Sequence, residues 1–217
     1  MNDDLRARVL AQVAGAPSPT RAVYRRRIVL VAVIGALATL ALFMAMGGMA
    51  RGTRPVEMIA FTVGFGLLAA AVLTRLSSSS SGTMLGRPRP VLLTAVVVTA
   101  PLLAVVAFGA TMAWPAPSHE PVAAASHLAC GVMSVLQGAL PLLVLLLPRR
   151  GSDPVHPMVT GAALGMTAGA WSVVMATLRC SHAAAMHSIL AHVVPTLILT
   201  ALGAGLGWLL LRLRSES

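Results

Sequence analysis

The stretch HLACGVMSVLQGALPLLVLLLPRR, residues 127–150, is a long apolar run that ends in an arginine pair. A helix rises about 1.5 Å per residue, so about 20 apolar residues are enough to cross the hydrocarbon core of a bilayer. Runs of this kind recur along the 217-residue chain, which is 57% hydrophobic and 10% charged, whereas soluble domains usually carry about 25% charged residues. The composition predicts an all-α, polytopic membrane protein with no room for a separate soluble domain of ordinary size.

Six apolar runs divide the chain into three parts. The predicted spans are 28–49, 56–74, 91–113, 125–147, 158–178 and 188–211. They form a six-helix transmembrane domain over 28–211, preceded by an N-terminal tail, 1–27, and followed by a short C-terminus, 212–217. Because the number of spans is even, both termini are expected on the same side of the membrane.

The basic residues indicate which side holds the termini. All sixteen are arginines, and the net charge is +10. If the N-terminus is inside, the outer loops hold Arg51, Arg54 and Arg179, which leaves thirteen of the sixteen for the inner segments. Cytoplasmic segments of membrane proteins carry the excess of arginine, so both termini are predicted in the cytoplasm. Because the arginines flank the apolar runs, their charge is explained by the orientation of the chain in the membrane. We therefore expect no direct binding to nucleic acid.

This topology places both cysteines at the outer face. Cys130 lies in the first turns of the fourth span, three residues after His127, and Cys180 follows the fifth span within LRCSHAAAMHSILAH, residues 178–192. His182 and His187 come next in the chain. A soft cation such as Zn²⁺, Cd²⁺ or Cu⁺ accepts mixed thiolate and imidazole ligands, and two cysteines whose Cα atoms lie within about 7 Å can form a disulfide instead. The third interpretation is that these histidines are incidental residues of the membrane interface.

The other histidines and the motif search carry less information. His192 lies about one turn into the sixth span, where a polar packing or pathway role is plausible, and His119 and His156 are interpreted as incidental. The chain has no HExxH, GxSxG or nucleotide-binding glycine loop, so no enzymatic function is predicted. The absence of CxxC argues against a thiol oxidoreductase. The alternative function is a small metal-binding or metal-transporting membrane protein, which would need ligands continuing through the bilayer.

Regularly spaced glycines predict how the last two spans pack. Gly161, Gly165 and Gly169 form two overlapping GxxxG steps in the fifth span, and Gly203 and Gly207 repeat the spacing in the sixth. Small residues in register let helix backbones approach closely in lipid. The pattern favours packing within the bundle, with a homodimer as the alternative.

The N-terminal tail contains a short amphipathic pattern. Its apolar residues Leu5, Val9, Leu10 and Val13 fall on one helical face, and Asp4 lies near the expected helix N-terminus, where the helix dipole favours an acidic residue. A helix this short is marginal alone. The segment is therefore interpreted either as a partner-binding element that orders on contact or as a solvated leader.

The chain resembles the NrsF family (negative regulator of sigma F), chiefly in its C-terminal half. The resemblance rests on HLACGVMSVLQGALPLLVLLLPRR, 127–150, and HPMVTGAALGMTAGAWSVVMATLRCSHAAAMHSILAH, 156–192, with six spans in this length and a DDL near the N-terminus. Its elements are Cys130, the arginine pair, the three glycines of the fifth span, and Cys180 followed by a histidine-bearing turn.

The resemblance implies an integral-membrane anti-sigma factor of the bacterial inner membrane. Such a protein would hold an extracytoplasmic-function sigma factor inactive. The paired outer cysteines of the family are associated with sensing metal or oxidative stress, which carries over here to Cys130 and Cys180. The tail, with Asp4, Leu5, Val9, Leu10 and Val13, becomes the candidate sigma-factor contact, and His127, His182 and His187 become candidate assistants to the cysteines.

Overall fold

The computed structural model describes residues 21–48, 122–149, 156–180, 182 and 184–211, together with scattered residues between 60 and 101. Its elements are all helical, which confirms the predicted all-α class for this part of the chain. They are α2 (Arg21–Ala45), α5 (Ala124–Leu146), the short 3-10 helix η1 (Leu147–Arg149), α6 (Pro157–Arg179), α7 (Ala185–Ser188), the π-helical turn η2 (Ile189–Val193) and α8 (Val194–Leu211).

Three of these helical segments are long and apolar enough to cross a membrane. They run over Ala124–Arg149, Pro157–Arg179 and Met186–Leu211, within a few residues of the fourth, fifth and sixth predicted spans. Helix α2 overlaps the first predicted span and contains a shorter apolar stretch, Val33–Ala45. Most of the second and third predicted spans falls outside the described residues, so the total of six spans stays a prediction.

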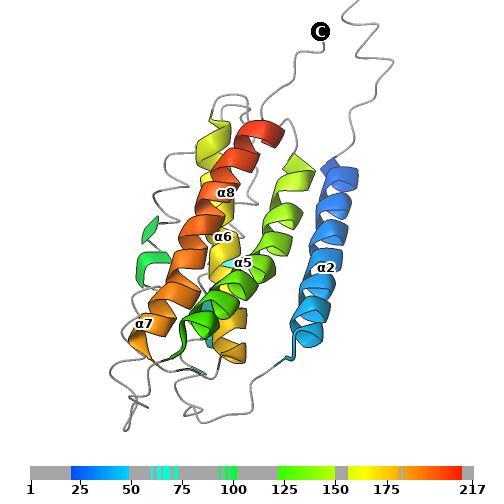
Figure 1. The fold of residues 1–217 in the computed structure, drawn as a ribbon. Coiled ribbons are helices and arrows are strands. Elements are labelled where there is room, and N and C mark those ends of the chain that lie inside the picture. Colours follow the sequence, from blue (N-terminus) through cyan, green and yellow to red (C-terminus); the bar gives the residue numbers. More distant parts are fainter. Residues whose placement is uncertain are drawn as a thin grey trace, which may run out of the picture.

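The helices lie side by side in one bundle (Figure 1). Helices α6 and α8 pack against each other most extensively, α5 packs against both, and α2 lies along α5. Helices α2 and α6 run in one direction, and α5 and α8 run in the opposite direction. We call the end that holds the start of α5, the end of α6 and α7 the thiol end. The opposite end, with the start of α2 and the end of α8, is the arginine end.

The contact between α6 and α8 depends on glycines, as the spacing predicts. A Cβ atom at Gly161 would collide with the carbonyl oxygen of Gly203, and one at Gly165 would collide with the carbonyl oxygen of Leu199. A Cβ atom at Gly207 would meet the backbone of Pro157. At these three glycines the backbone of one helix contacts the backbone of the other, so there is no side chain that could move to make room for a Cβ atom. The predicted packing of these glycines within the bundle is therefore confirmed.

Replacing Gly165 with valine is expected to separate the two helices. Overpacking a core usually costs about 1–3 kcal/mol, and a clash against rigid backbone belongs at the upper end of that range. The measurement is thermal unfolding of the detergent-solubilised protein. Gly205→Val is the matched control, because a Cβ atom at Gly205, in the partner helix α8, meets nothing within 4 Å. Equal unfolding temperatures for the two variants would contradict this packing.

Pro195 explains the π-helical turn η2. In a regular helix the amide of residue 195 would donate to the carbonyl of Ala191, but proline has no N–H and its ring crowds that carbonyl. The chain widens instead, and the Val194 amide donates to the Ile189 carbonyl. Ser134 of α5 lies across from the turn, with its hydroxyl oxygen 2.7 Å from the Ala191 oxygen. A hydroxyl from a neighbouring helix thus satisfies the carbonyl that proline leaves without its helical donor.

Candidate thiol and metal site

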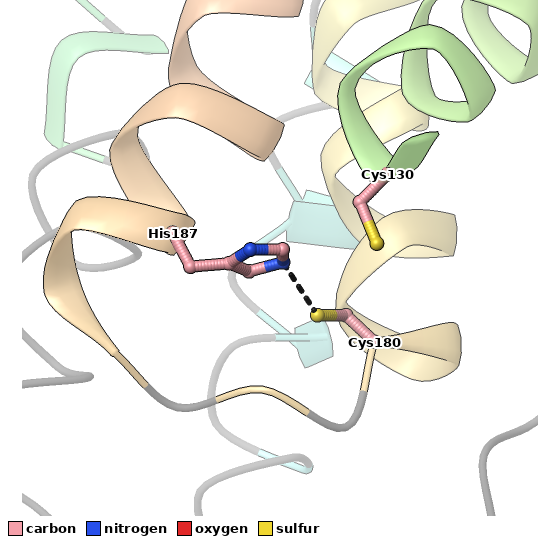
Figure 2. Close-up of side chains that lie close together, drawn as sticks. All are labelled: Cys130, Cys180 and His187. Carbon is pink, nitrogen blue, oxygen red and sulfur yellow. Dashed lines mark hydrogen bonds between the residues drawn. The ribbon is translucent and has the colours of Figure 1, made fainter. Parts of the chain in front are cut away.

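Three side chains from three helical segments converge at the thiol end. Cys130 comes from α5, Cys180 follows the last residue of α6, and His187 comes from α7 (Figure 2). The two sulfur atoms and a ring nitrogen of His187 all lie within 4.8 Å of one another. The Sγ of Cys180 lies 3.2 Å from Nε2 of His187, which is hydrogen-bond distance for sulfur. Cys130 lies 50 or more positions before the other two residues in the chain, whereas Cys180 and His187 are only seven positions apart.

Local backbone geometry brings Cys180 into the cluster. Its amide still donates to the carbonyl of Ala176, as in the last turn of a helix, but its own backbone is extended, with φ −77° and ψ 130°. The chain therefore leaves α6 at Cys180 and turns back toward α7. Its thiol also lies 3.7 Å from the backbone carbonyl of His182. The end of α6 thus fixes one sulfur beside the start of the next helical segment.

His187 is the centre of a group of imidazoles. Its Nδ1 lies 3.0 Å from Nδ1 of His127, on the side of the ring opposite the Cys180 contact. The centroid of the His182 ring lies 4.9 Å away, and that of His192 lies 5.7 Å away, both oriented edge to face. Each of the other described histidines at the thiol end therefore contacts His187. Both nitrogens of His187 are occupied, one by a thiol and one by an imidazole.

The cluster is largely shielded from the surroundings. His187 has no exposed surface, Cys180 is 6% exposed and His192 is 4% exposed, whereas Cys130 and His127 are half-buried. Both cysteines are free thiols. Buried polar groups are stable only when they are hydrogen-bonded. The close thiol–imidazole and imidazole–imidazole contacts meet that requirement at His187, and Cys130 marks the side on which the cluster is accessible.

The sequence predicted part of this arrangement. Cys130, Cys180 and His187 are brought together as candidate ligands, while His127 and His182 contact the ring of His187. His192, assigned only a packing or pathway role, joins the same group of rings. His156 immediately precedes α6 at the arginine end, far from the cluster.

Several sequence-based assignments concern residues outside the described ranges. His119 is one, and the tail residues proposed to bind a partner are the others: Asp4, Leu5, Val9, Leu10 and Val13. Sequence reasoning also gave no special weight to His187 over His127 and His182. The one available signal was its spacing, because His187 follows Cys180 by only seven residues and lies at the start of the next helical segment.

Ser134 connects the cluster to the rest of the bundle. It lies one helical turn after Cys130, and its hydroxyl oxygen is 2.8 Å from the Cys130 carbonyl as well as 2.7 Å from that of Ala191. The hydroxyl of Ser172 in α6 donates in turn to the Ser134 carbonyl. Residues of α5, α6 and η2 therefore meet in one hydrogen-bonded group, one helical turn along α5 from Cys130.

The helices that are long and apolar enough to cross a membrane indicate a helical membrane protein, and its bundle carries a thiol–imidazole group at one end. The NrsF family, described as "Negative regulator of sigma F", matches residues 11–213, and the chain belongs to this family. The resemblance noted from the sequence is thereby confirmed. The family is one of anti-sigma factors, which implies a sigma factor as partner and suggests a regulatory role rather than an enzymatic one. Neither the curated proteins nor the solved structures contain a significant match.

Proposed function

We propose that this protein is a membrane-embedded anti-sigma factor that releases an extracytoplasmic-function sigma factor when a metal or oxidant acts on Cys130 and Cys180. The family match over residues 11–213 carries the proposal. The cluster supports the sensing part, because two free thiols, one in α5 and one at the end of α6, lie within 4.8 Å of each other and could converge on one ion or form one disulfide. The cytoplasmic tail, 1–27, is proposed to hold the sigma factor.

The distribution of arginines supports an outward-facing thiol end. Helix α2 begins at the arginine end with Arg21 and the run 25–27, and Arg149 ends η1 at the same end. Arg179, the last residue of α6, lies at the thiol end. Arginine accumulates on the cytoplasmic side, so this arrangement favours the arginine end inside and the thiol end in the periplasm. Both termini and the sigma factor are then on the cytoplasmic side of the inner membrane.

The helix directions are compatible with six spans. Helix α2 ends at the thiol end, and α5 begins there. The segment between them must therefore cross the bundle an even number of times. The two further spans predicted at 56–74 and 91–113 meet that condition, and the described residues between 60 and 101 are helical.

The signal is proposed to act by changing how α5, α6 and α7 are spaced. A disulfide brings two sulfur atoms to about 2.05 Å, and a shared metal ion brings them to about 4 Å or less, while the ligand atoms in this structure are spread over distances of up to 4.8 Å. The hydrogen bonds at Ser134 transmit such a shift to the π-helical turn and α8. Two packing states with different affinities for the sigma factor would then couple the outer face to the tail.

A metal transporter is less well supported. Transport needs ligands along a path through the bilayer. Among the described residues, both cysteines and four histidines lie at the thiol end, and the remaining histidine, His156, lies at the arginine end. A sensor needs ligands at one face only, which is the observed arrangement.

Purification of the full-length protein from gently solubilised membranes tests the proposed partner. An extracytoplasmic-function sigma factor is expected to co-purify in about equal amounts and to dissociate when the inducing metal or oxidant is added. Mass spectrometry identifies the partner, and the same preparation from cells that lack that sigma factor gene is the control. The cells must contain the sigma factor and must not have been exposed to the inducing signal. If the protein is then recovered without any sigma factor, the anti-sigma assignment fails.

A further inference from the structure

We infer that His187 is the third ligand of a Zn²⁺- or Cd²⁺-type cation bound by Cys130 and Cys180, and that His127 positions His187 for this role. The inference rests on the proposed function, whose sensing site it specifies. It assigns different roles to histidines that the sequence treats alike. His187 would touch the ion, His127 would act through His187, and His182 would do neither.

The positions of the ligand atoms fit one tetrahedral ion. With Zn–S bonds of about 2.3 Å and Zn–N bonds of about 2.0 Å, neighbouring ligand atoms lie about 3.5–3.8 Å apart. The Cys180 sulfur and the His187 nitrogen are 3.2 Å apart, and the whole set lies within 4.8 Å. A movement of about 1 Å or less is therefore enough to form the site. Figure 2 shows the Cys130 sulfur directed toward the other two side chains from the neighbouring helix.

The charge of the ligand set selects a divalent ion. Two thiolates neutralise a 2+ charge, and the imidazole adds none, so the buried site is neutral overall. A monovalent Cu⁺ ion would leave a net charge of −1 beside the fully buried His187, and burying an uncompensated charge is costly. Mg²⁺ and Ca²⁺ require oxygen ligands, whereas the converging atoms are sulfur and nitrogen. Borderline-soft divalent ions such as Zn²⁺ and Cd²⁺ match both the charge and the ligand type.

His127 determines which nitrogen of His187 is available. To bind a metal through Nε2, His187 must carry its proton on Nδ1. That Nδ1 lies 3.0 Å from Nδ1 of His127, which accepts the proton's hydrogen bond if His127 carries its own proton on Nε2. Ligating histidines usually donate their second N–H to such a partner, which fixes the ring and raises its basicity. With the proton on Nδ1 of His187 and the His127 Nδ1 as its acceptor, Nε2 of His187 would be free to bind the ion.

Metal binding replaces the existing hydrogen bond without additional reactants. Each thiol gives up one proton as its sulfur bonds to the ion, and both protons go to solvent, since only thiolates ligate. No oxidant or reductant is needed. Three protein ligands leave one tetrahedral position, which water can fill. Cys130 is half-buried, so the ion can approach from its side.

Titration of the reduced, full-length protein in detergent with Cd²⁺ tests the ligand set. Thiolate-to-cadmium charge-transfer absorption reports the sulfur ligands, X-ray absorption reports sulfur and nitrogen separately, and competition with a chelator gives the affinity. We expect one ion per chain with two sulfur ligands and at least one nitrogen. His187→Ala should weaken binding by more than about 100-fold and remove the nitrogen, since loss of an outer-shell partner alone costs about 10–100-fold.

The positioning role of His127 has a separate readout. His127→Leu should weaken binding by about 10–100-fold while keeping the same sulfur and nitrogen ligands in the X-ray absorption spectrum. His127→Gln restores an acceptor and should recover part of the affinity. His156→Ala, at the opposite end of the bundle, is the matched control and should bind as the unmodified protein does. Helicity and thermal unfolding without metal identify any variant that fails to fold.

The outcomes that overturn the inference are distinct from failure of the proposed function. Unchanged cadmium affinity in a folded His187→Ala protein removes His187 from the ligand set, and loss of the nitrogen signal in His127→Leu would make His127 a ligand instead. No stoichiometric binding by the reduced, unmodified chain removes the site altogether. The sigma factor is tested on the same metal-free preparations: if it co-purifies while cadmium binding fails, the anti-sigma function stands and the metal site does not.

Discussion

A chain that lacks residues 1–14 is expected to leave sigma-dependent transcription at the level of a strain without the protein. The proposed sigma-factor contact lies in this segment, and its apolar residues Leu5, Val9 and Leu10 would all be lost. The deletion keeps Arg21 and the arginines of 25–27, which orient the first span, so the protein should still accumulate in the membrane. The measurement is a transcriptional reporter for the partner sigma factor, with membrane levels checked by immunoblot.

Point substitutions separate loss of contact from loss of the tail. In a helix with about 100° per residue, Val9 falls on the apolar face and Ala11 falls on the opposite face. Val9→Asp should therefore raise transcription strongly, and Ala11→Asp, which introduces the same charge, should not. Full repression by the deletion variant would show that the sigma factor is held elsewhere. Equal effects of the two aspartates would indicate that charge alone, rather than an apolar face, matters.

The variant with both Cys130→Ser and Cys180→Ser is expected to repress normally and to lose its response to the inducing signal. Serine keeps the size of the side chain but supplies neither a soft ligand nor a disulfide. Moving a two-state protein from 1:99 to 99:1 requires a ligand that favours one state about 10⁴-fold. Without thiolates, a soft cation cannot provide that difference at this site. The measurement is reporter activity across graded metal and oxidant exposures.

The single cysteine variants show whether the thiols act together. A shared ion or a disulfide needs both sulfur atoms, so each single variant should respond as poorly as the double variant. Independent thiols would instead leave each single variant with part of the response. A normal response of the double variant to every inducing stress would exclude the cysteines as the sensor.

The sequence was sufficient to predict the long helices that the structure describes, because the residue patterns that produce them are local. The apolar run that ends at the arginine pair predicts α5, and the described helix is Ala124–Leu146 followed by η1. The glycine spacing predicts the α6–α8 contact for the same reason, since a residue every four positions lies on one helical face. The side of the membrane on which Cys130 and Cys180 lie also follows, as a prediction, from counting arginines.

The geometry of the site was not predictable in the same way, because it depends on residues far apart in the chain. Nothing local indicates that Nδ1 of His127 faces Nδ1 of His187, 60 residues away. Ser134 looks like an ordinary small residue of an apolar run until Ala191 is placed beside it. From the sequence His192 was assigned a packing or pathway role in the sixth span, but the turn η2 places its ring 5.7 Å from that of His187.

That turn also fixes the rotational phase between the two functional faces of the last span. Counted at about 100° per residue, an uninterrupted helix would put His187 about 160° around the axis from Gly203. The extra residue accommodated by η2 reduces this angle to about 60°. The imidazole of His187 and the glycine face of α8, formed by Gly203 and Gly207, therefore point toward the same side of the molecule. Pro195, through the extra residue in η2, therefore rotates His187 relative to Gly203 by one residue step, about 100°. An insertion or deletion between Ser188 and Val194 would rotate His187 away from the side of Gly203 and Gly207, even if every one of these side chains were retained.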